Sequence, residues 1–379
     1  MSGIAGILRR DGREVPEKWI VRLEKSLLHS GMTPKRFEDS IPIQSGDLHI
    51  TLLGSDPVMQ DSTESSMMVI DGSLEGECAL ATWNQHSLEL ELERRGVGCK
   101  SLYWLDLADA GDGLLFSTNP LPLLQICHDV GHTNDYFSQG VREYLQFGIA
   151  IEGGSLLAPL YAVPPTPPTP LNATEPNPIQ QFEGIHRIEC DFSTSIAEDI
   201  LALIQILGTP YSDITLLSKY WQYQVAKRNG KTILEGLKVP KQQKTTVADK
   251  LKESHLLKRL LAPTKGEMLK DTLVEQARRI QLHAIASHVG ADILVSTSRD
   301  AIDPIDIPLD SWFRNPQSSL GQLAGETFSI ADNFEGLPLE QSEVIELFNQ
   351  HQQNGAVDYS EQLFALLTLV LWHRQVHAS

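Results

Sequence analysis

Prolines concentrated between residues 164 and 178 divide this chain more sharply than any other feature of its sequence. They are Pro164, Pro165, Pro167, Pro168, Pro170, Pro176 and Pro178. Because proline lacks an amide hydrogen and has a fixed φ, such a stretch cannot lie within a helix or a central strand. We expect an extended, exposed linker over residues 163–180. The sequence therefore predicts two domains, 1–162 and 181–379, on either side of it.

Short apolar runs separated by turn signals precede the linker. The apolar runs predict strands at Ser2–Leu8, His49–Gly54, Met67–Ile70, Cys78–Trp83, Leu88–Leu92 and Leu102–Leu107. Tight turns are predicted at Asp11-Gly12, Asp71-Gly72 and Asp112-Gly113. Helical spacing marks Trp19–His29 and Tyr136–Phe147. This mixture predicts two layers of antiparallel sheet with flanking helices.

After the linker the apolar spacing becomes helical. It predicts helices at Ser195–Gly208, Leu216–Lys227, Lys270–Val289, Pro338–Asn354 and Ser360–His373. Asp292–Ser296 is the one run in this half that predicts a buried strand. The aromatic residues Trp312, Phe313 and Trp372 are expected in the core rather than in a stacking platform for a base.

Charge and cysteine usage narrow the class of protein. The net charge of −18 disfavours nucleic acid and anionic membranes as partners, since both attract basic surfaces. The four cysteines are far apart and form no Cys-x-x-Cys pair, which indicates free thiols in a reducing compartment. The chain has neither a signal-peptide layout nor an apolar run long enough to span a bilayer. We therefore expect a cytoplasmic protein.

Two groups of residues invite a metal interpretation, and both fall short of it. Asp300, Asp303, Asp306 and Asp310 do not have the spacing of a calcium loop, and prolines interrupt them, so we expect a solvated loop. His128 and His132 are four residues apart, but Gly131 lies between them and the glutamate of a zinc helix is missing. The sequence predicts no metal site.

The first residues offer a possible nucleophile. The chain begins Met1-Ser2-Gly3-Ile4-Ala5-Gly6-Ile7, so removal of Met1 would place the Ser2 hydroxyl beside its own α-amine. Such an amine can act as the base for an adjacent nucleophile. The alternative is an ordinary start that leads into a buried edge strand. Together with Asp11-Gly12, this opening resembles class II glutamine amidotransferases, and most closely the glutamine-hydrolysing asparagine synthetase family.

Further blocks resemble the same family in the same order along the chain. They are Leu74–Asn84, Arg94–Trp104, Val141–Gly148, Tyr161–Pro165, Ile307–Arg314, Glu343–His351 and Leu363–His373. The resemblance implies an α+β protein, with an N-terminal Ntn-type αββα sandwich followed by a reduced, mostly helical remnant of the synthetase α/β domain. It also implies a dimer interface on the N-terminal domain.

The glutaminase residues of that family are altered here. Ser2 stands where the family has its cysteine nucleophile, and Asp71-Gly72 stands where the family has the Asn-Gly pair of the oxyanion and glutamine site. A carboxylate repels a developing oxyanion, whereas an amide donates a hydrogen bond to it. The strand that carries the family's substrate-binding arginine corresponds to His49–Leu53, which contains no arginine.

The nucleotide-binding motifs are also missing. The family binds ATP and Mg²⁺ through a Ser-Gly-Gly-x-Asp-Ser loop, and neither this loop nor a Walker loop occurs in the sequence. At the place of the second family motif, Lys231–Gly236 keeps one glycine and one acidic residue. The sequence therefore predicts no ATP-binding residues and no cofactor.

These losses favour a degenerate asparagine synthetase-like protein without glutaminase or ATP-dependent synthetase chemistry. It would act as a structural or regulatory partner, in a homodimer or with another protein through its N-terminal domain. Two alternatives stay open. One is an amidotransferase or amide-bond-forming ligase that is active with Ser2 or with a partner subunit. The other is a binding module that senses an amino acid.

Overall fold

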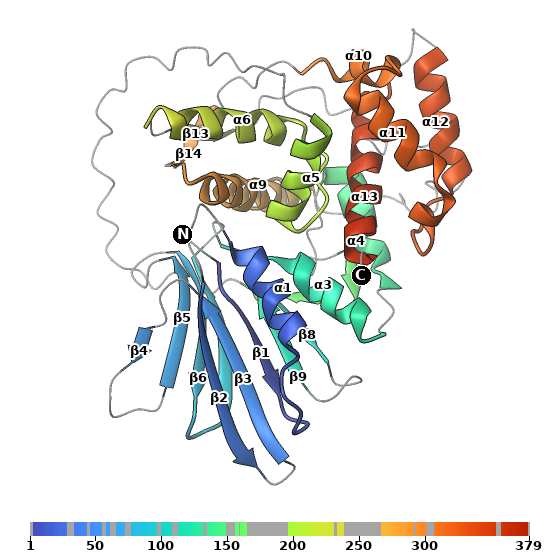
Figure 1. The fold of residues 1–379 in the computed structure, drawn as a ribbon. Coiled ribbons are helices and arrows are strands. Elements are labelled where there is room, and N and C mark those ends of the chain that lie inside the picture. The colour runs from blue at the N-terminus through green and yellow to red at the C-terminus, as the bar shows by residue number, and fades with distance from the viewer. Residues whose placement is uncertain are drawn as a thin grey trace.

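The computed structural model has two large antiparallel sheets and a small two-stranded one before the proline-rich stretch, and mainly helices after it (Figure 1). It describes residues 3–28, 34–43, 46–54, 58–60, 66–72, 77–96, 100–107, 113–131, 135–148, 156–158, 160–164, 196–230, 233–238, 267–291, 293–300, 307–353 and 358–377. Ser2 and most of the predicted linker lie outside these residues. No helix in the described ranges has both the length and the apolar character that a membrane span requires.

The larger sheet has six strands in the order β12-β8-β9-β1-β3-β2. Its strands are β1 (Ala5–Arg9), β2 (Lys35–Ile43), β3 (Gly46–Gly54), β8 (Tyr103–Asp106), β9 (Gly113–Ser117) and β12 (Leu160–Ala162). Every neighbouring pair is antiparallel. The β1 strand lies near the middle, between β9 and β3, and therefore starts in the interior of the molecule and not at a sheet edge.

The smaller sheet has four antiparallel strands in chain order. They are β4 (Val58–Gln60), β5 (Ser66–Gly72), β6 (Cys78–Asn84) and β7 (Glu89–Arg95). Alternate side chains of a strand point to opposite faces of a sheet. Ile50 and Leu52 of β3 accordingly share one buried cluster with Val69 of β5 and Trp83 of β6. The two predicted sheet layers are thus present and enclose a common core.

Helices cover the other face of the larger sheet. Trp19 and Leu23 of α1 (Glu17–Leu27) pack in one cluster with Ile7 and Leu115 of the sheet. Next to α1 lies α3 (Pro120–Asp129), a helix that the sequence analysis did not predict. The side chain of Asn119 accepts a hydrogen bond from the Leu121 amide and so caps this helix. Two short strands, β10 (Asp135–Tyr136) and β11 (Leu157–Ala158), flank α4 (Ser138–Phe147).

Helices dominate the second half of the chain. They are α5 (Ile196–Leu207), α6 (Thr215–Arg228), α9 (Glu267–Val289), α10 (Leu309–Arg314), α11 (Ser319–Ser329), the short 3-10 helix η1 (Ala331–Phe334), α12 (Gln341–Gln353) and α13 (Ser360–His377). Two strands, β13 (Ile233–Lys238) and β14 (Ile293–Asp300), pair in parallel. The sequence predicted β14 but not β13.

The helix α13 organises the second half. It packs against α3, α5, α10, α11 and α12, and most of its side chains are buried. Trp372 lies almost fully inside, where its indole N–H donates to the carbonyl of Gly208 at 2.9 Å. Phe313 is buried and Trp312 packs against the same cluster, so the prediction of core aromatic residues is confirmed.

One apolar cluster runs through both halves of the molecule. It joins Leu23 of α1 and Leu124 of α3 to Leu203 of α5 and Leu367 of α13. The mixture of sheet and helix confirms the α+β class. The division into domains at residues 162 and 181 stays a prediction, because the linker lies outside the described residues.

Candidate functional site

A small cavity of about 60 Å³ opens where the ends of several strands meet helix α9. Its walls include Gly3 and Asp71, which the sequence analysis placed next to or within the altered glutaminase site. Lys100 and Thr118 line it from the larger sheet side, and His283 lines it from α9. The fold therefore brings the start of the chain and Asp71 to one pocket. Ser2 itself lies outside the described residues.

Asp71 forms a buried ion pair with Lys100. The Nζ of Lys100 donates to Oδ1 of Asp71 at 2.7 Å, and the two side chains are 10% and 8% exposed. Burial raises the pKa of the Asp71 carboxyl, while the Lys100 ammonium opposes that shift. At 2.7 Å the charge-assisted hydrogen bond holds both groups in place.

Glycine at position 3 is required by close contact with Thr118. A Cβ on Gly3 would lie 2.1 Å from Oγ1 of Thr118, which a real side chain cannot do. The amide of Ile4 donates to the same hydroxyl oxygen at 3.2 Å, and the amide of Thr118 donates to the carbonyl of Ile4 at 2.9 Å. These contacts hold Gly3 in the wall of the cavity and fix the backbone that follows it.

Gly72 has a structural role beside the pocket. Its φ is +121°, and a Cβ there would lie 2.3 Å from the carbonyl oxygen of Glu77. It pairs with Cys78 at the end of the β5–β6 ladder and does not line the cavity. Of the predicted Asp71-Gly72 pair, the structure places only Asp71 in the pocket wall.

Helix α9 closes the cavity from the side of the second half. The Arg279 guanidinium lies 3.3 Å from the Glu77 carboxylate, which ties α9 to the start of β6. One helical turn further on, burial lowers the pKa of His283 to about 4, and the cations Arg279 and Lys100 lower it in the same direction. His283 is therefore a neutral imidazole at physiological pH.

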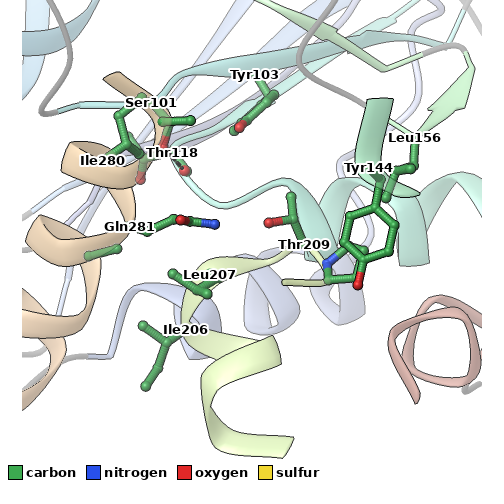
Figure 2. Close-up of a pocket in the computed structure, with 13 residues that line it drawn as sticks. Ser101, Tyr103, Thr118, Tyr144, Leu156, Ile206, Leu207, Thr209, Ile280 and Gln281 are labelled. Atoms are coloured by element: carbon green, nitrogen blue, oxygen red, sulfur yellow. Dashed lines mark hydrogen bonds between the residues drawn. The ribbon is translucent and has the colours of Figure 1, made fainter. Parts of the chain in front are cut away.

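A second cavity of about 100 Å³ adjoins the first and shares Ser101, Thr118 and Ile280 with it. Figure 2 shows Gln281 of α9 and Thr209, which follows α5, pointing into the same space. Tyr103 lines this cavity from β8, and burial raises the pKa of its phenol. The wall thus offers an amide and hydroxyls but few charges, a composition that suits a small polar molecule and not a phosphate.

A group of two aspartates and one histidine in the second half has the composition of a metal site. The hydrogen bonds of its histidine indicate a structural role instead. Ligand atoms of Asp310, His351 and Asp358 lie within 4.8 Å of one another. The amide of Tyr359 donates to Nδ1 of His351 at 3.1 Å, so a neutral imidazole carries its proton on Nε2. That proton faces Asp310, whose carboxylate also pairs with Arg314 at 2.8 Å. A cation at Nε2 would break this arrangement.

The remaining predicted positions have ordinary environments or fall outside the described residues. Asp300 ends the strand β14 and Asp310 lies in the first turn of α10, so the prediction that these two belong to a solvated loop is wrong. The ring of His128, on α3, contacts that of His377. Cys78 and Cys127 are buried free thiols, as predicted. The positions outside the described residues are Asp303, Asp306, His132, Cys99 and Cys190.

Sequence reasoning missed Lys100, Thr118 and His283 as pocket residues. Lys100 belongs to the block Arg94–Trp104 that carries the family resemblance, but nothing in the sequence connects it with Asp71. Only the pairing of β5 with its neighbours and the position of α9 bring these side chains together. Neither a protein-family model nor a curated protein matches the sequence.

Proposed function

We propose that this protein is a degenerate relative of glutamine-hydrolysing asparagine synthetase that performs neither half-reaction and serves as a structural or regulatory partner. The observation that carries the proposal is the buried ion pair between Asp71 and Lys100. It occupies the place where the family resemblance puts an oxyanion donor.

The chemistry of that ion pair is unsuited to hydrolysis of an amide. A tetrahedral intermediate needs donors aimed at its developing negative charge. The ionised carboxylate of Asp71 only accepts hydrogen bonds, and its negative charge offsets the charge of the Lys100 ammonium, which donates to it at 2.7 Å. Turning Lys100 away from Asp71 and toward an oxyanion would leave Asp71 charged and unpaired in a buried site, which is costly.

The second half does not suit a nucleotide. In parallel sheets, phosphates bind beyond the carboxyl ends of the strands, on glycine-rich turns that lead into a helix. The two described parallel strands end at Lys238 and Asp300, and the sequence continues Val239-Pro240 and Ala301-Ile302. Neither continuation contains glycine. The residues present therefore do not fit ATP and its magnesium ion in the way the family binds them.

The same proposal extends to fold and location. The two sheets, with α1 and α3 on one face, support an Ntn-type αββα sandwich. The described residues account for three of its layers, one of helices and two of sheet. A partner or second copy would bind through this half, in the cytoplasm. The acidic net charge disfavours nucleic acid and membranes as partners.

One observation favours an enzyme as the second candidate. The neutral imidazole of His283 lines the same pocket as Gly3, the residue after Ser2. A neutral histidine can act as a general base for a serine hydroxyl. The alternative is therefore an amidotransferase or amide-forming ligase that depends on Ser2, alone or with an ATP-binding subunit. An amino-acid sensor that uses the two adjoining cavities is a third possibility.

Turnover assays on the purified full-length chain separate these candidates. We expect no ammonia release from glutamine and no ATP–pyrophosphate exchange above the level without protein. The Ser2→Ala and His283→Gln variants should match the wild type, with Ser318→Ala as a control remote from the pocket. Turnover that is lost in Ser2→Ala but kept in Ser318→Ala would establish the enzyme and refute the proposal.

A further inference from the structure

A groove of about 810 Å³ runs between α1, α3 and α5, next to the small pocket but on the outside of the molecule. Figure 1 shows α1 and α3 side by side beneath α5. Apolar side chains form part of the groove, among them Val21, Leu121 and Ile206. The groove is therefore large enough for several residues of another chain and has an apolar surface on which they can pack.

Basic residues of α1 line the same groove. Lys18, Arg22 and Lys25 lie on one helix face, because they are four and three residues apart. Lys18 and Arg22 share a single carboxylate, that of Asp129, at 3.5 and 3.0 Å. Lys25 has no carboxylate partner among the described residues. Positive side chains thus outnumber the carboxylates of Glu17 and Asp129 at the groove.

Other charges at the groove reduce this excess without cancelling it. Glu17 also lines the groove, and its two carboxylate oxygens accept hydrogen bonds at 2.9 Å from Arg36, which is shared with the carboxylate of Glu38. The α9 side contributes His288, whose pKa is lowered by burial, so its imidazole is neutral at physiological pH. A local surplus of positive charge therefore lies on a chain whose net charge is −18. Such a contrast favours an acidic partner.

We infer that this groove binds an acidic peptide segment of a partner protein, with acidic side chains on the α1 cations and apolar side chains on the groove floor. Lys18 and Arg22 are separated by about 6 Å along the helix axis, since each residue rises about 1.5 Å. In an extended peptide, side chains two residues apart point the same way and lie about 7 Å apart. Alternating acidic and apolar residues therefore match the groove.

The assignment rests on the proposed function, because an inactive chain acts through what it binds. Nucleic acid and anionic membranes are poor candidates for the same groove, since both would meet the acidic remainder of the surface. A short peptide segment contacts only the groove, so the positive charge at the groove is enough to attract it.

Fluorescence anisotropy with a labelled peptide of alternating glutamate and leucine, about eight residues long, tests the groove. We expect saturable binding to the full-length protein, weakened about tenfold or more in the double variant Lys18→Glu with Lys25→Glu. The matched control, Lys227→Glu with Arg228→Glu, makes the same change in net charge at the exposed end of α6 and should bind like the wild type. Circular dichroism establishes that both variants fold.

The assignment is overturned if the wild type does not bind the peptide, if the α6 control weakens binding as much as the α1 variant, or if a glutamate–serine peptide of equal charge binds as tightly. If sedimentation shows instead that the α1 variant abolishes a dimer and leaves peptide binding unchanged, the occupant is a second copy and the inference is wrong. None of these measurements involves turnover, so the assays of glutamine and ATP chemistry decide the proposed function separately.

Discussion

The two halves of this molecule build their cores in different ways. The first half encloses side chains such as Val69 and Trp83 between two antiparallel sheets. The second half has only a two-stranded parallel ladder among its described residues, and a helix, α13, holds its centre. A sheet buries alternate residues of many strands, whereas α13 is buried around nearly its whole circumference.

Among its described residues, the second half thus relies on helix packing more than on a sheet. Parallel sheets are stable when helices cover both faces. Here α13 provides the surface on which α3, α5, α11 and α12 pack. Hydrogen bonds join it to the rest of the chain, since Tyr144 donates to the carbonyl of Ala365 at 2.8 Å. The described helices of this half therefore share a core centred on α13.

The largest effect should come from removing a tryptophan from each core. Trp372→Ala removes a buried side chain and its hydrogen bond to Gly208, so we expect a loss of about 5 kcal/mol in the free energy of unfolding. Trp83→Ala should cost about 3 kcal/mol, because the buried indole N–H of Trp83 has no hydrogen-bond partner to lose. Urea denaturation followed by circular dichroism measures both. A greater loss in Trp83→Ala would contradict the central role of α13.

The next effect concerns the buried ion pair between Lys100 and Asp71. Lys100→Met leaves Asp71 buried without its cation and should destabilise the fold by about 3 kcal/mol at neutral pH. Because an unpaired Asp71 then has an even higher pKa in the folded state, acidification should restore part of that loss. The control Lys227→Met alters an exposed lysine and should be neutral within error. Equal losses at neutral and acidic pH would show that packing, and not charge, is responsible.

A smaller comparison involves one helix cap in each half. Ser318 caps α11 by accepting from the Gly321 amide at 2.9 Å, so Ser318→Ala should cost about 1 kcal/mol. Asn119 caps α3 and also donates to the carbonyl of Gln205 in α5 at 2.9 Å, so Asn119→Ala should cost about 2 kcal/mol. Thermal melts of both variants test this order. Equal losses would mean that the contact between α3 and α5 contributes little.

The last prediction is a pH dependence that comes from two buried histidines of the second half, one on α9 beside the pocket and one on α13. Burial lowers the pKa of His283 and of His373 to about 4, below the value of about 6.5 in an unfolded chain. The unfolded state therefore binds more protons between these values, and stability falls as the pH drops from about 6.5 to about 4. The slope of unfolding free energy against pH is proportional to the difference in bound protons between the unfolded and folded states. His283→Gln should lower that difference by up to one proton, and His373→Gln should do the same. The control His86→Gln alters an exposed histidine and should leave the slope unchanged. A change in the control as large as in the two variants would show that burial of His283 and His373 is not the cause.

The sequence predicted most of the helices and many of the strands, but it missed the apolar run of β9. Trp19–His29, Ser195–Gly208 and Ser360–His373 correspond to α1, α5 and α13, because apolar spacing and the cap at Gly208 are local signals. It missed β2, whose side chains are mostly exposed, and α3, which begins with a proline-containing apolar run. Neither element has a period that distinguishes it from a loop.

The site could be predicted only in part. Asp71 was singled out by its place in the family pattern, and it does line the pocket. Its partner Lys100 and the imidazole of His283 come from elements distant in the chain, and only tertiary packing brings them near. The groove cations lie on one face of α1, and their spacing in the sequence could have predicted this. The opposite wall is formed by α3 and α5, and no sequence pattern predicts that these helices lie next to α1.

The central claim is that this chain has kept a ligase framework without the groups that hold adenylate or attack an amide. Isothermal titration of the full-length protein with ATP and Mg²⁺ tests it most directly. We expect no saturable heat of binding at nucleotide concentrations up to the millimolar range. A saturable site of one nucleotide per chain would contradict it.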